Sequence, residues 1–309
     1  MTISYSPGWT ASIREVVIGA TAAEGGTRRI SYRIGGESDL PCIGKGRKPL
    51  IAFEICDDPA LWPDVVRSAC TKLVDNPPAW AEYVDTTLKA DLIRLNLTST
   101  RRRNFDAYDA VGKTVRSVLA ATSLPLIIEG SADPEIDSEI FQRCGEAGEK
   151  ERLVLGTAEA ARYRSVAAAA IAYGHSVIAQ SPIDVNLAKQ LNILLREAGV
   201  PDDRIIIDPY TGALGYGFEY TYSTMERIRF AALKGDADLA MPMICAPSDT
   251  LTIKEIRGAV HNHETAVSWE VATSVAAALA GATILVVRHP ASLARLRDAI
   301  DSLWNMEVA

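Results

Sequence analysis

Two polar segments, each following a short apolar stretch, hold the side chains best suited to bind a ligand. Gln180, Ser181 and Asp184 follow one such stretch, and Asp208 follows the next. Between them, residues 187–198 carry leucines at helical spacing, which predicts a helix with one buried face. A strand, a helix and a parallel strand in this order place both polar segments at the carboxyl ends of the strands, where ligands bind in such sheets. The sequence therefore predicts a binding face that includes these four residues.

Three glycines follow Asp208, at Gly212, Gly215 and Gly217. Because glycine has no side chain and accepts positive φ, backbone at these positions can approach a ligand closely. A tight turn between a strand and a helix would use the same glycines, so both roles remain open. The polar pair Ser181 and Asp184 has a second role open to it as well, which is to cap the helix that begins beside it.

Apolar segments typical of buried strands alternate with segments of helical periodicity along most of the chain. The expected strands are 50–55, 92–97, 124–128, 152–155, 176–179, 204–207, 239–244 and 283–287. The expected helices are 60–89, 106–122, 136–147, 158–173, 185–198, 218–234, 265–280 and 291–304. Alternating units of this number over about 260 residues match a (β/α)8 barrel, the α/β fold known as a TIM barrel. The count favours this closed barrel over a doubly wound open sheet.

The amino-terminal segment has a different pattern. Residues 16–18 and 30–34 are short apolar stretches on either side of the glycine pair 25–26, which predicts a β-hairpin. We expect this hairpin to plug or flank the barrel. No linker or low-complexity stretch divides the chain. The sequence therefore predicts a single domain, with residues 1–46 as extension and hairpin and 47–309 as barrel.

The composition argues against several classes of protein. The chain carries a net charge of -7, whereas nucleic-acid binding requires a basic face. No apolar run reaches the ~18 residues of a membrane helix, and the amino-terminal segment lacks the pattern of a secretory signal. Five cysteines are scattered without paired spacing, so neither a disulfide framework nor an iron–sulfur site is expected. We therefore expect a cytoplasmic protein without nucleic-acid or membrane partners.

Polar residues at the other strand ends extend the binding face, but they form no evident catalytic set. Asn96, Glu129, Thr157 and His289 each lie at or just beyond an expected strand end. No lysine stands alone at a strand end, and no serine or cysteine has an evident histidine partner. The pair His261 and His263 is a weak metal signal by itself, and the run 101–103 of arginines is typical of a solvated loop. We expect neither catalytic nor metal-binding residues.

Long stretches of the sequence resemble one family. They are QSPIDVNLAKQLNIL (180–194), IIIDPYTGALGYGFEYTYSTMERIRFAAL (205–233), GATILVVRHPASLAR (281–295) and VVIGATAAEGGTR (16–28). These stretches resemble the small subunit of the corrinoid iron–sulfur protein, also called the delta subunit of the acetyl-CoA decarbonylase/synthase complex. The resemblance implies a TIM barrel that forms a heterodimer with a large subunit carrying the corrinoid domain and the iron–sulfur cluster.

The same resemblance implies a role in methyl transfer without catalysis by this chain. The heterodimer would receive a methyl group from methyltetrahydrofolate through a methyltransferase and pass it to acetyl-CoA synthase, meeting both enzymes transiently. Cobalamin would be shared with the large subunit, and this chain would hold no iron–sulfur cluster. The residues expected to face the corrinoid are Asn96, Glu129, Thr157, Gln180, Ser181, Asp184, Asp208, Gly212, Gly215 and His289.

The barrel also resembles the wider pterin-binding group, which includes dihydropteroate synthases and methyltetrahydrofolate methyltransferases. Those enzymes have an acid, an asparagine and an Asp-Pro at three strand ends, and the matching positions are Glu129, Thr157 and Asp208. Asp208 agrees in type, but Thr157 lacks the paired donor and acceptor of an amide. This difference disfavours pterin binding. A pterin-dependent methyltransferase remains the alternative, together with a paralogous subunit of another corrinoid system, because 101–103, 157 and the short loop 246–265 depart from the family pattern.

Overall fold

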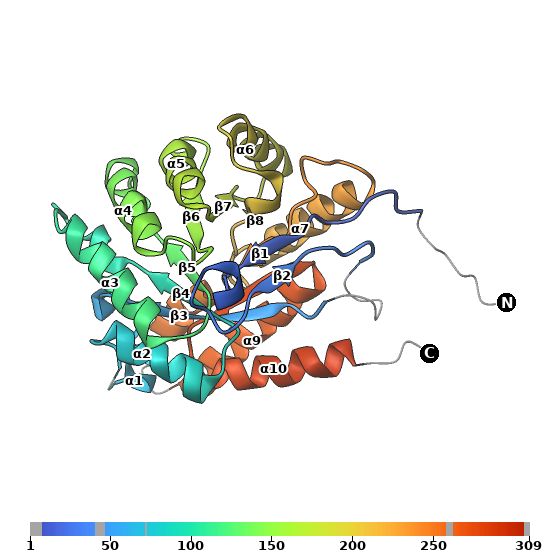
Figure 1. The fold of residues 1–309 in the computed structure, drawn as a ribbon. Coiled ribbons are helices and arrows are strands. Elements are labelled where there is room, and N and C mark those ends of the chain that lie inside the picture. The colour runs from blue at the N-terminus through green and yellow to red at the C-terminus, as the bar shows by residue number, and fades with distance from the viewer. Residues whose placement is uncertain (1–7, 41–46, 72, 258–261, 306–309) are drawn as a thin grey trace.

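A computed structural model describes residues 8–40, 47–71, 73–257 and 262–305. Eight parallel strands form a closed barrel in which β10 pairs with β3 (Figure 1). The strands are β3 (Leu50–Cys56), β4 (Leu92–Asn96), β5 (Leu126–Glu129), β6 (Val154–Ala158), β7 (Ser176–Gln180), β8 (Ile205–Asp208), β9 (Met243–Cys245) and β10 (Ala282–Val287). The closure confirms the (β/α)8 barrel that the alternation predicts and excludes the open sheet.

Helices surround the barrel. They are α1 (Asp64–Ala69), α2 (Pro77–Tyr83), α3 (Tyr108–Ala121), α4 (Pro134–Ala147), α5 (Tyr163–Tyr173), α6 (Val185–Glu197), α7 (Phe218–Leu233), α8 (Lys254–Arg257), α9 (His263–Leu279) and α10 (Pro290–Trp304). The expectation of one helix over 60–89 is wrong. Asn76 caps α2 and proline follows it, and because proline lacks the N–H and clashes with the preceding turn, it starts a new helix there.

All expected strands are found, and two of them differ from the observed ones by more than two residues at one end. The strand expected at 239–244 is limited to β9, since Pro242 cannot donate a ladder hydrogen bond. The strand expected at 152–155 instead begins at Val154 and extends to Ala158. Thr157 therefore lies inside β6 rather than beyond its end.

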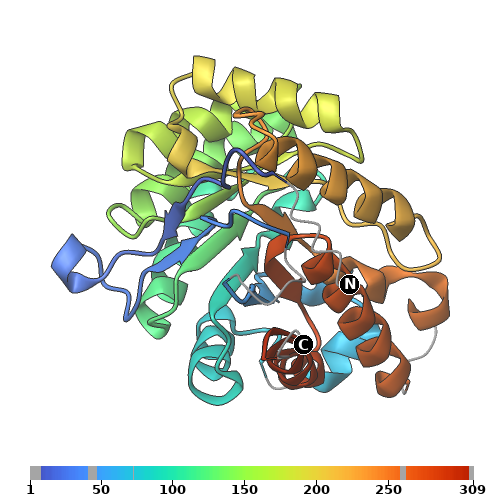
Figure 2. The same ribbon diagram turned by 90° about the vertical axis from the view of Figure 1, so that its right-hand side faces the viewer.

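The predicted hairpin is confirmed and plugs one end of the barrel. β1 (Val16–Ile18) and β2 (Tyr32–Ile34) pair antiparallel, and Val16, Ile18 and Ile34 pack with the apolar residues inside the barrel. In Figure 2 the blue hairpin crosses the barrel end that faces the viewer. Backbone hydrogen bonds join Gly19 to Arg152 and Arg29 to Ser123, both of which precede strands. The hairpin therefore covers the amino-terminal end and leaves the carboxyl end for the candidate site.

A buried arginine fixes the hairpin to the barrel. Arg28 Nε donates to Glu151 Oε2 at 2.8 Å, and its other nitrogens donate to the carbonyl oxygens of Leu119 and Thr122. Both charged side chains are almost fully buried, so their pairing satisfies groups that would otherwise be costly to desolvate.

Within the part of the chain that the structure describes, no helix combines the length and the apolar character needed to cross a bilayer.

Candidate functional site

The inside of the barrel changes from apolar to polar toward the carboxyl ends of the strands. Every second residue of a strand faces the same side, and the interior cluster includes Ala52, Leu92, Ile127, Ile178, Ile206 and Val286. Two residues further along each strand come Glu54, Arg94, Glu129, Gln180, Asp208 and Arg288. Alternation therefore builds a charged layer directly above an apolar one, at the end opposite the hairpin.

Glu54 is the centre of this charged layer. It is fully buried, and it accepts hydrogen bonds from Asn96 Nδ2 at 2.7 Å, Arg288 Nη2 at 3.0 Å and Ser248 Oγ at 3.0 Å. Arg94 Nη1 lies 3.5 Å from Glu54 Oε2. Burial alone would raise the pKa of Glu54, but the two guanidiniums outweigh burial and hold that pKa at about 2. Glu54 is therefore ionised in the folded protein.

Arg94 connects Glu54 to the second acid of the layer. Its Nη2 lies 2.7 Å from Glu129 Oε2, while Arg101 approaches the other oxygen of Glu129 at 3.9 Å. Burial raises the pKa of Glu129, although Arg94 opposes this effect. Arg94 thus places a positive charge between two carboxylates inside the barrel, where an arginine is tolerated only because it is paired.

Asp208 lies on the far side of the layer, beside Gln180. Gln180 Nε2 donates to Asp208 Oδ2 at 2.8 Å, and the backbone N–H of Tyr210 donates to Oδ1 at 2.8 Å. Burial raises the pKa of Asp208 to about 6, because these two hydrogen bonds only partly offset desolvation. Asp208 can therefore gain or lose a proton near neutral pH.

Another buried acid holds the junction between β10 and α10. Glu270, on α9, accepts the backbone N–H groups of Arg288 at 2.7 Å and His289 at 3.2 Å. Burial raises the pKa of Glu270 to about 7. The guanidinium of Arg288 lies 4.9 Å from the ring centre of Trp62, a stacking contact that favours arginine over lysine. These contacts orient Arg288 toward Glu54.

His289 has both ring nitrogens engaged within the protein. Its Nδ1 accepts the N–H of Ala291 at 3.2 Å, so His289 caps α10. Its Nε2 lies 3.0 Å from Nδ1 of His263. Burial, followed by the nearby His263, lowers the pKa of His289 to about 4. The imidazole is therefore neutral, and it has no free nitrogen for a ligand or a metal.

The structure brings some of the residues that the sequence selects together and gives others a separate role. Asn96, Glu129, Gln180 and Asp208 lie together in the charged layer of the barrel. The side chain of Asp184 accepts the N–H groups of Asn186 and Leu187 and so caps α6, as one of its two open roles predicts. Ser181 is fully buried, and Thr157 Oγ1 lies 3.4 Å from a nitrogen of Arg162.

The glycines after β8 serve the turn. A Cβ at Gly212 would lie 2.9 Å from the carbonyl carbon of Gly217, so a side chain there would displace backbone. Gly215 has a φ of 75°, a left-handed value that favours glycine, and a Cβ there would meet open space. The turn role is therefore supported for Gly212.

Three charged residues of the layer were not selected from the sequence. Glu54 lies inside an otherwise apolar strand, Arg288 directly follows β10, and Arg94 interrupts the apolar residues of β4. The signal that could have found Arg94 is its position two residues after Leu92 and two before Asn96, on the inward face. A charge at such a position requires buried partners, and so it points to a polar network inside the barrel.

The remaining arginines and histidines that stand out in the sequence and that the structure describes lie outside the charged layer or at its edge. Residues 101–103 are exposed, as a solvated loop predicts, and Arg101 and Arg102 also lie within ion-pair distance of Glu129 and Asp58. His261 lies outside the described residues, and within those residues no group of three or more potential ligands is arranged to hold a metal ion. His175 is buried and hydrogen-bonded to Leu153 and Gly145, so its role is structural.

Exposed apolar side chains gather at the rim beside Asp208. Tyr210 and Tyr216 are each 47% exposed, Tyr220 is 63% exposed and Ile183 is 37% exposed. The backbone N–H of Ile183 donates to Pro209 at 3.0 Å, which joins the loops after β7 and β8. We call Ile183, Tyr210, Tyr216 and Tyr220 the aromatic rim. Such clusters on a protein surface commonly mark an interaction site.

Solved structures of dihydropteroate synthases share this fold. The enzyme from Xanthomonas albilineans with 4-aminobenzoic acid matches with a TM-score of 0.60 at 15% identity, over 96% of this chain and 100% of that protein. The Yersinia pestis enzyme matches with a TM-score of 0.58 at 15% identity, over 90% of this chain and 98% of that protein. Identities this low show the fold alone. The class defined by fold and site is a (β/α)8 barrel whose carboxyl end carries an internal ion network.

Sequence comparison assigns the family within this class. Residues 15–297 match the family described as CO dehydrogenase/acetyl-CoA synthase delta subunit. The acetyl-CoA decarbonylase/synthase complex subunit delta 1 of Methanosarcina thermophila is 34% identical over 314 residues, which cover 96% of this chain and 72% of that protein. The delta subunit of Archaeoglobus fulgidus is 34% identical over 325 residues, which cover 97% of this chain and 70% of that protein. The chain belongs to the CO dehydrogenase/acetyl-CoA synthase delta subunit family, which confirms the resemblance.

Proposed function

We propose that this chain is the small, non-catalytic subunit of a cytoplasmic corrinoid iron–sulfur methyl carrier. Its barrel covers a cobalamin that a large subunit holds together with the iron–sulfur cluster, and the heterodimer carries methyl groups from methyltetrahydrofolate to acetyl-CoA synthase. Family membership supports the assignment to such a complex. The single domain of 1–309, with the hairpin in 1–46 and the barrel in 47–309, is the unit that docks.

The observation that carries the proposal is the aromatic rim beside a charged layer whose members pair with one another. Arg94 lies between Glu54 and Glu129, and together with Arg288 beside Glu54 it balances their two charges, so these acids have no need of a bound cation. Tyr210 and Tyr220 remain exposed at the same end. A face of this kind suits contact with a large, partly apolar surface presented by another chain better than the enclosure of a small polar substrate.

Residues on this face fit the two kinds of surface that a corrinoid presents, an apolar ring and a periphery of amides. Asn96 Oδ1 and Ser181 Oγ are buried and have no hydrogen-bond partner among the described residues. With Thr157, Gln180 and Asp208 they provide donors and acceptors for amide groups. When bound, the corrinoid supplies the metal that carries the methyl group. This chain's residues orient the ring's periphery and exclude water from it.

Co-expression with the large subunit tests the proposal. We expect the chain alone to leave the visible spectrum of added cobalamin unchanged, and the purified heterodimer to carry the corrinoid. Tight cobalamin binding by the isolated chain would contradict the proposed sharing. So would the absence of a complex with a folded, corrinoid-loaded large subunit.

Asp208 provides one observation in favour of the alternative, a pterin-dependent methyltransferase. It is a buried acid at a strand end, and it titrates at about 6, in the range suited to exchange a proton with a pterin ring. Thr157 and the paired Arg94 disfavour this function. Calorimetry with methyltetrahydrofolate distinguishes the two functions. The alternative requires that the isolated chain binds methyltetrahydrofolate and that Asp208→Ala abolishes this binding. The main proposal expects no binding of methyltetrahydrofolate by the isolated chain.

A further inference from the structure

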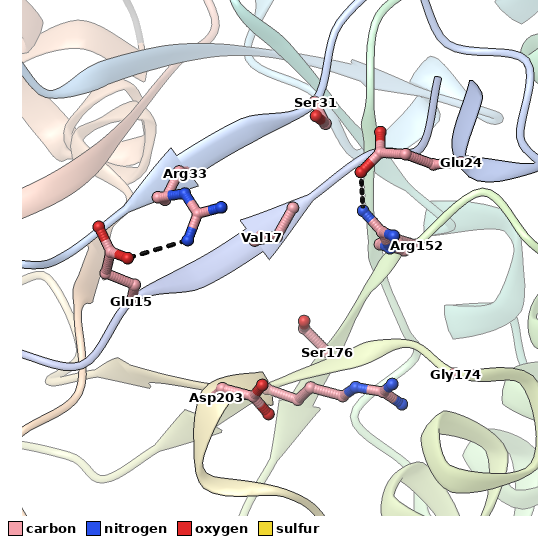
Figure 3. A pocket seen from close by; sticks show the side chains of 10 residues that line it. Glu15, Val17, Glu24, Ser31, Arg33, Arg152, Gly174, Ser176 and Asp203 are labelled. Carbon is pink, nitrogen blue, oxygen red and sulfur yellow. Dashed lines mark hydrogen bonds and ion pairs between the residues drawn. The ribbon is translucent and has the colours of Figure 1, made fainter. Parts of the chain in front are cut away.

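A polar pocket lies at the opposite end of the molecule, between the hairpin and the strand beginnings. It has a volume of about 440 Å³. Figure 3 shows Arg33 and Val17 of the hairpin on one side, with Arg152 and Ser176 of the barrel on the other. Arg204, which directly precedes β8, also lines it. The candidate site at the carboxyl ends of the strands uses none of these residues.

Two of the arginines in this pocket are paired at only one nitrogen. Arg33 Nη1 lies 2.9 Å from Glu15, and Arg152 Nη1 lies 2.6 Å from Glu24 (Figure 3). A guanidinium has five N–H donors in a planar fork, so each keeps donors for another acceptor. Arg204 has no ion pair or side-chain hydrogen bond with any other residue that the structure describes.

The local charge is balanced although the chain is acidic. The lining holds three arginines against the three carboxylates of Glu15, Glu24 and Asp203. Glu15 also pairs at 2.6 Å with Arg47, which lies outside the lining. The chain as a whole has a net charge of -7, so an anion meets less repulsion in this pocket than the average surface of the chain would offer.

The backbone that presents Arg152 is strained. Its φ is 48°, a left-handed value that is uncommon for residues other than glycine. The hairpin holds it there, because the N–H of Gly19 donates to the carbonyl of Arg152 at 3.0 Å. Strain of this kind concentrates at functional sites. The hairpin thus does two things at once, closing the barrel and setting Arg152 opposite Arg33.

We propose that this pocket binds a small phosphorylated molecule, whose phosphate group is held by Arg204 and by the free donors of Arg33 and Arg152. Planar guanidiniums suit phosphate because each can donate two parallel hydrogen bonds. The hydroxyls of Ser31 and Ser176 provide further polar contacts. The volume lies within the usual range for ligand pockets and exceeds that of a free phosphate, so the rest of the ligand is a small polar group.

Calorimetry on the full chain tests this site with inorganic phosphate and glycerol 3-phosphate, at constant ionic strength adjusted with chloride. We expect saturable binding of both, tighter for glycerol 3-phosphate. Arg204→Gln should weaken it at least tenfold, and Arg152→Lys should weaken it less, since it keeps the charge but loses the fork. The matched control is Arg227→Gln, which removes an exposed arginine of α7 and should leave binding unchanged.

Three results would overturn the site. They are the absence of saturable heat with either compound, equal weakening by Arg204→Gln and Arg227→Gln, and acetate binding as tightly as phosphate. Thermal unfolding of each variant without ligand separates lost binding from lost folding. Because the measurement involves neither cobalamin nor a large subunit, its failure leaves the proposed function untouched, and the failure of that function leaves this site standing.

Discussion

Glu54 bears a full negative charge where no solvent reaches it, and this is stable only because four polar groups surround it. Arg94 and Arg288 approach from two strands, Asn96 from the end of one of them and Ser248 from the loop after β9. Removing the carboxylate leaves two guanidiniums buried with too few acceptors. The cost of such a loss is the desolvation of the remaining charges rather than the strength of one bond.

Glu54→Gln should therefore destabilise the protein far more than the loss of an exposed acid. We expect a loss of about 3 kcal/mol in the free energy of unfolding, measured by urea denaturation at pH 7. The control is Glu139→Gln, which removes the partner of Arg143 on the surface of α4 and should cost less than about 0.5 kcal/mol. Similar small losses in the two variants would show that the charged layer does not contribute to stability as the contacts indicate.

Asp208 predicts a pH dependence of opposite sign to that of an ordinary paired acid. Its pKa is about 6 in the folded protein, above the ordinary 3.8. Between these values the folded chain holds a proton that the unfolded chain has released, so its contribution is present below pH 4 and is lost as the pH rises through 6. The difference in unfolding free energy between Asp208→Asn and the parent should grow by about 2 kcal/mol from pH 4 to pH 8. A constant difference would contradict this assignment.

Half of the charged layer could be predicted from residue type and spacing. Asn96, Glu129, Gln180 and Asp208 stand at strand ends, where polar side chains stand out from apolar surroundings. Arg94 could not be selected as a strand end, and its partners Glu54 and Glu129 become evident only when β3 and β5 are known to flank β4. The histidine pair shows the same limit, since 26 residues separate His263 from His289.

Among the elements, the hairpin depends most on its surroundings, because its two strands of three residues each are too short to be stable alone. Successive side chains of β1 alternate between buried and half-buried positions. Val16 and Ile18 are fully buried in the barrel, whereas Val17 faces the polar pocket. The barrel therefore stabilises the hairpin, and the hairpin in turn shields the apolar residues at the barrel's amino-terminal end.

Substitutions on the two faces of β1 should separate these contributions. Ile18→Ala leaves a cavity inside the barrel and should cost about 3 kcal/mol of unfolding free energy. Val17→Ala, one residue away on the other face, should cost less than about 1 kcal/mol. Hydrogen exchange of the backbone amides of β1 and β2 adds a local measurement, in which only Ile18→Ala should speed exchange. Equal costs would mean that the hairpin lies on the barrel without filling it.

Element positions were largely predictable because periodicity is a local property. The helix from 218 to 233 agrees with its expected range within a residue, and its exposed Tyr220 and Phe230 did not obscure the pattern. The failure over 60–89 has a local cause too, since the prolines at 77 and 78 outweigh the helical spacing around them. Strand ends were less certain, because hydrogen bonding to neighbouring strands decides them.

At the scale of the whole molecule, the two ends of the barrel differ in surface chemistry. The amino-terminal end has paired arginines and a polar pocket, whereas the carboxyl end has the aromatic rim. Exposing four large side chains together has no benefit for the isolated chain. A partner that covers them would gain from their burial, and the rigid rings of Tyr210 and Tyr220 would lose little conformational freedom on binding.

Substitution of the rim should consequently weaken the complex without weakening the fold. We expect Tyr210→Ser combined with Tyr220→Ser to raise the dissociation constant for the large subunit at least tenfold, a loss of about 1.4 kcal/mol. Thermal unfolding of the isolated variant should be nearly unchanged, because both side chains are already exposed.

The matched control is Ile171→Ser, which removes an apolar side chain of α5 that is 42% exposed and lies outside the rim. Both variants lose exposed apolar surface, so a general loss of hydrophobicity would weaken the complex in both. Docking at the carboxyl end predicts an effect in the tyrosine variant alone, since only its side chains lie beside Asp208 and the charged layer. If Ile171→Ser weakens the complex as strongly, the partner covers the side of the barrel, and the role proposed for its carboxyl end is wrong.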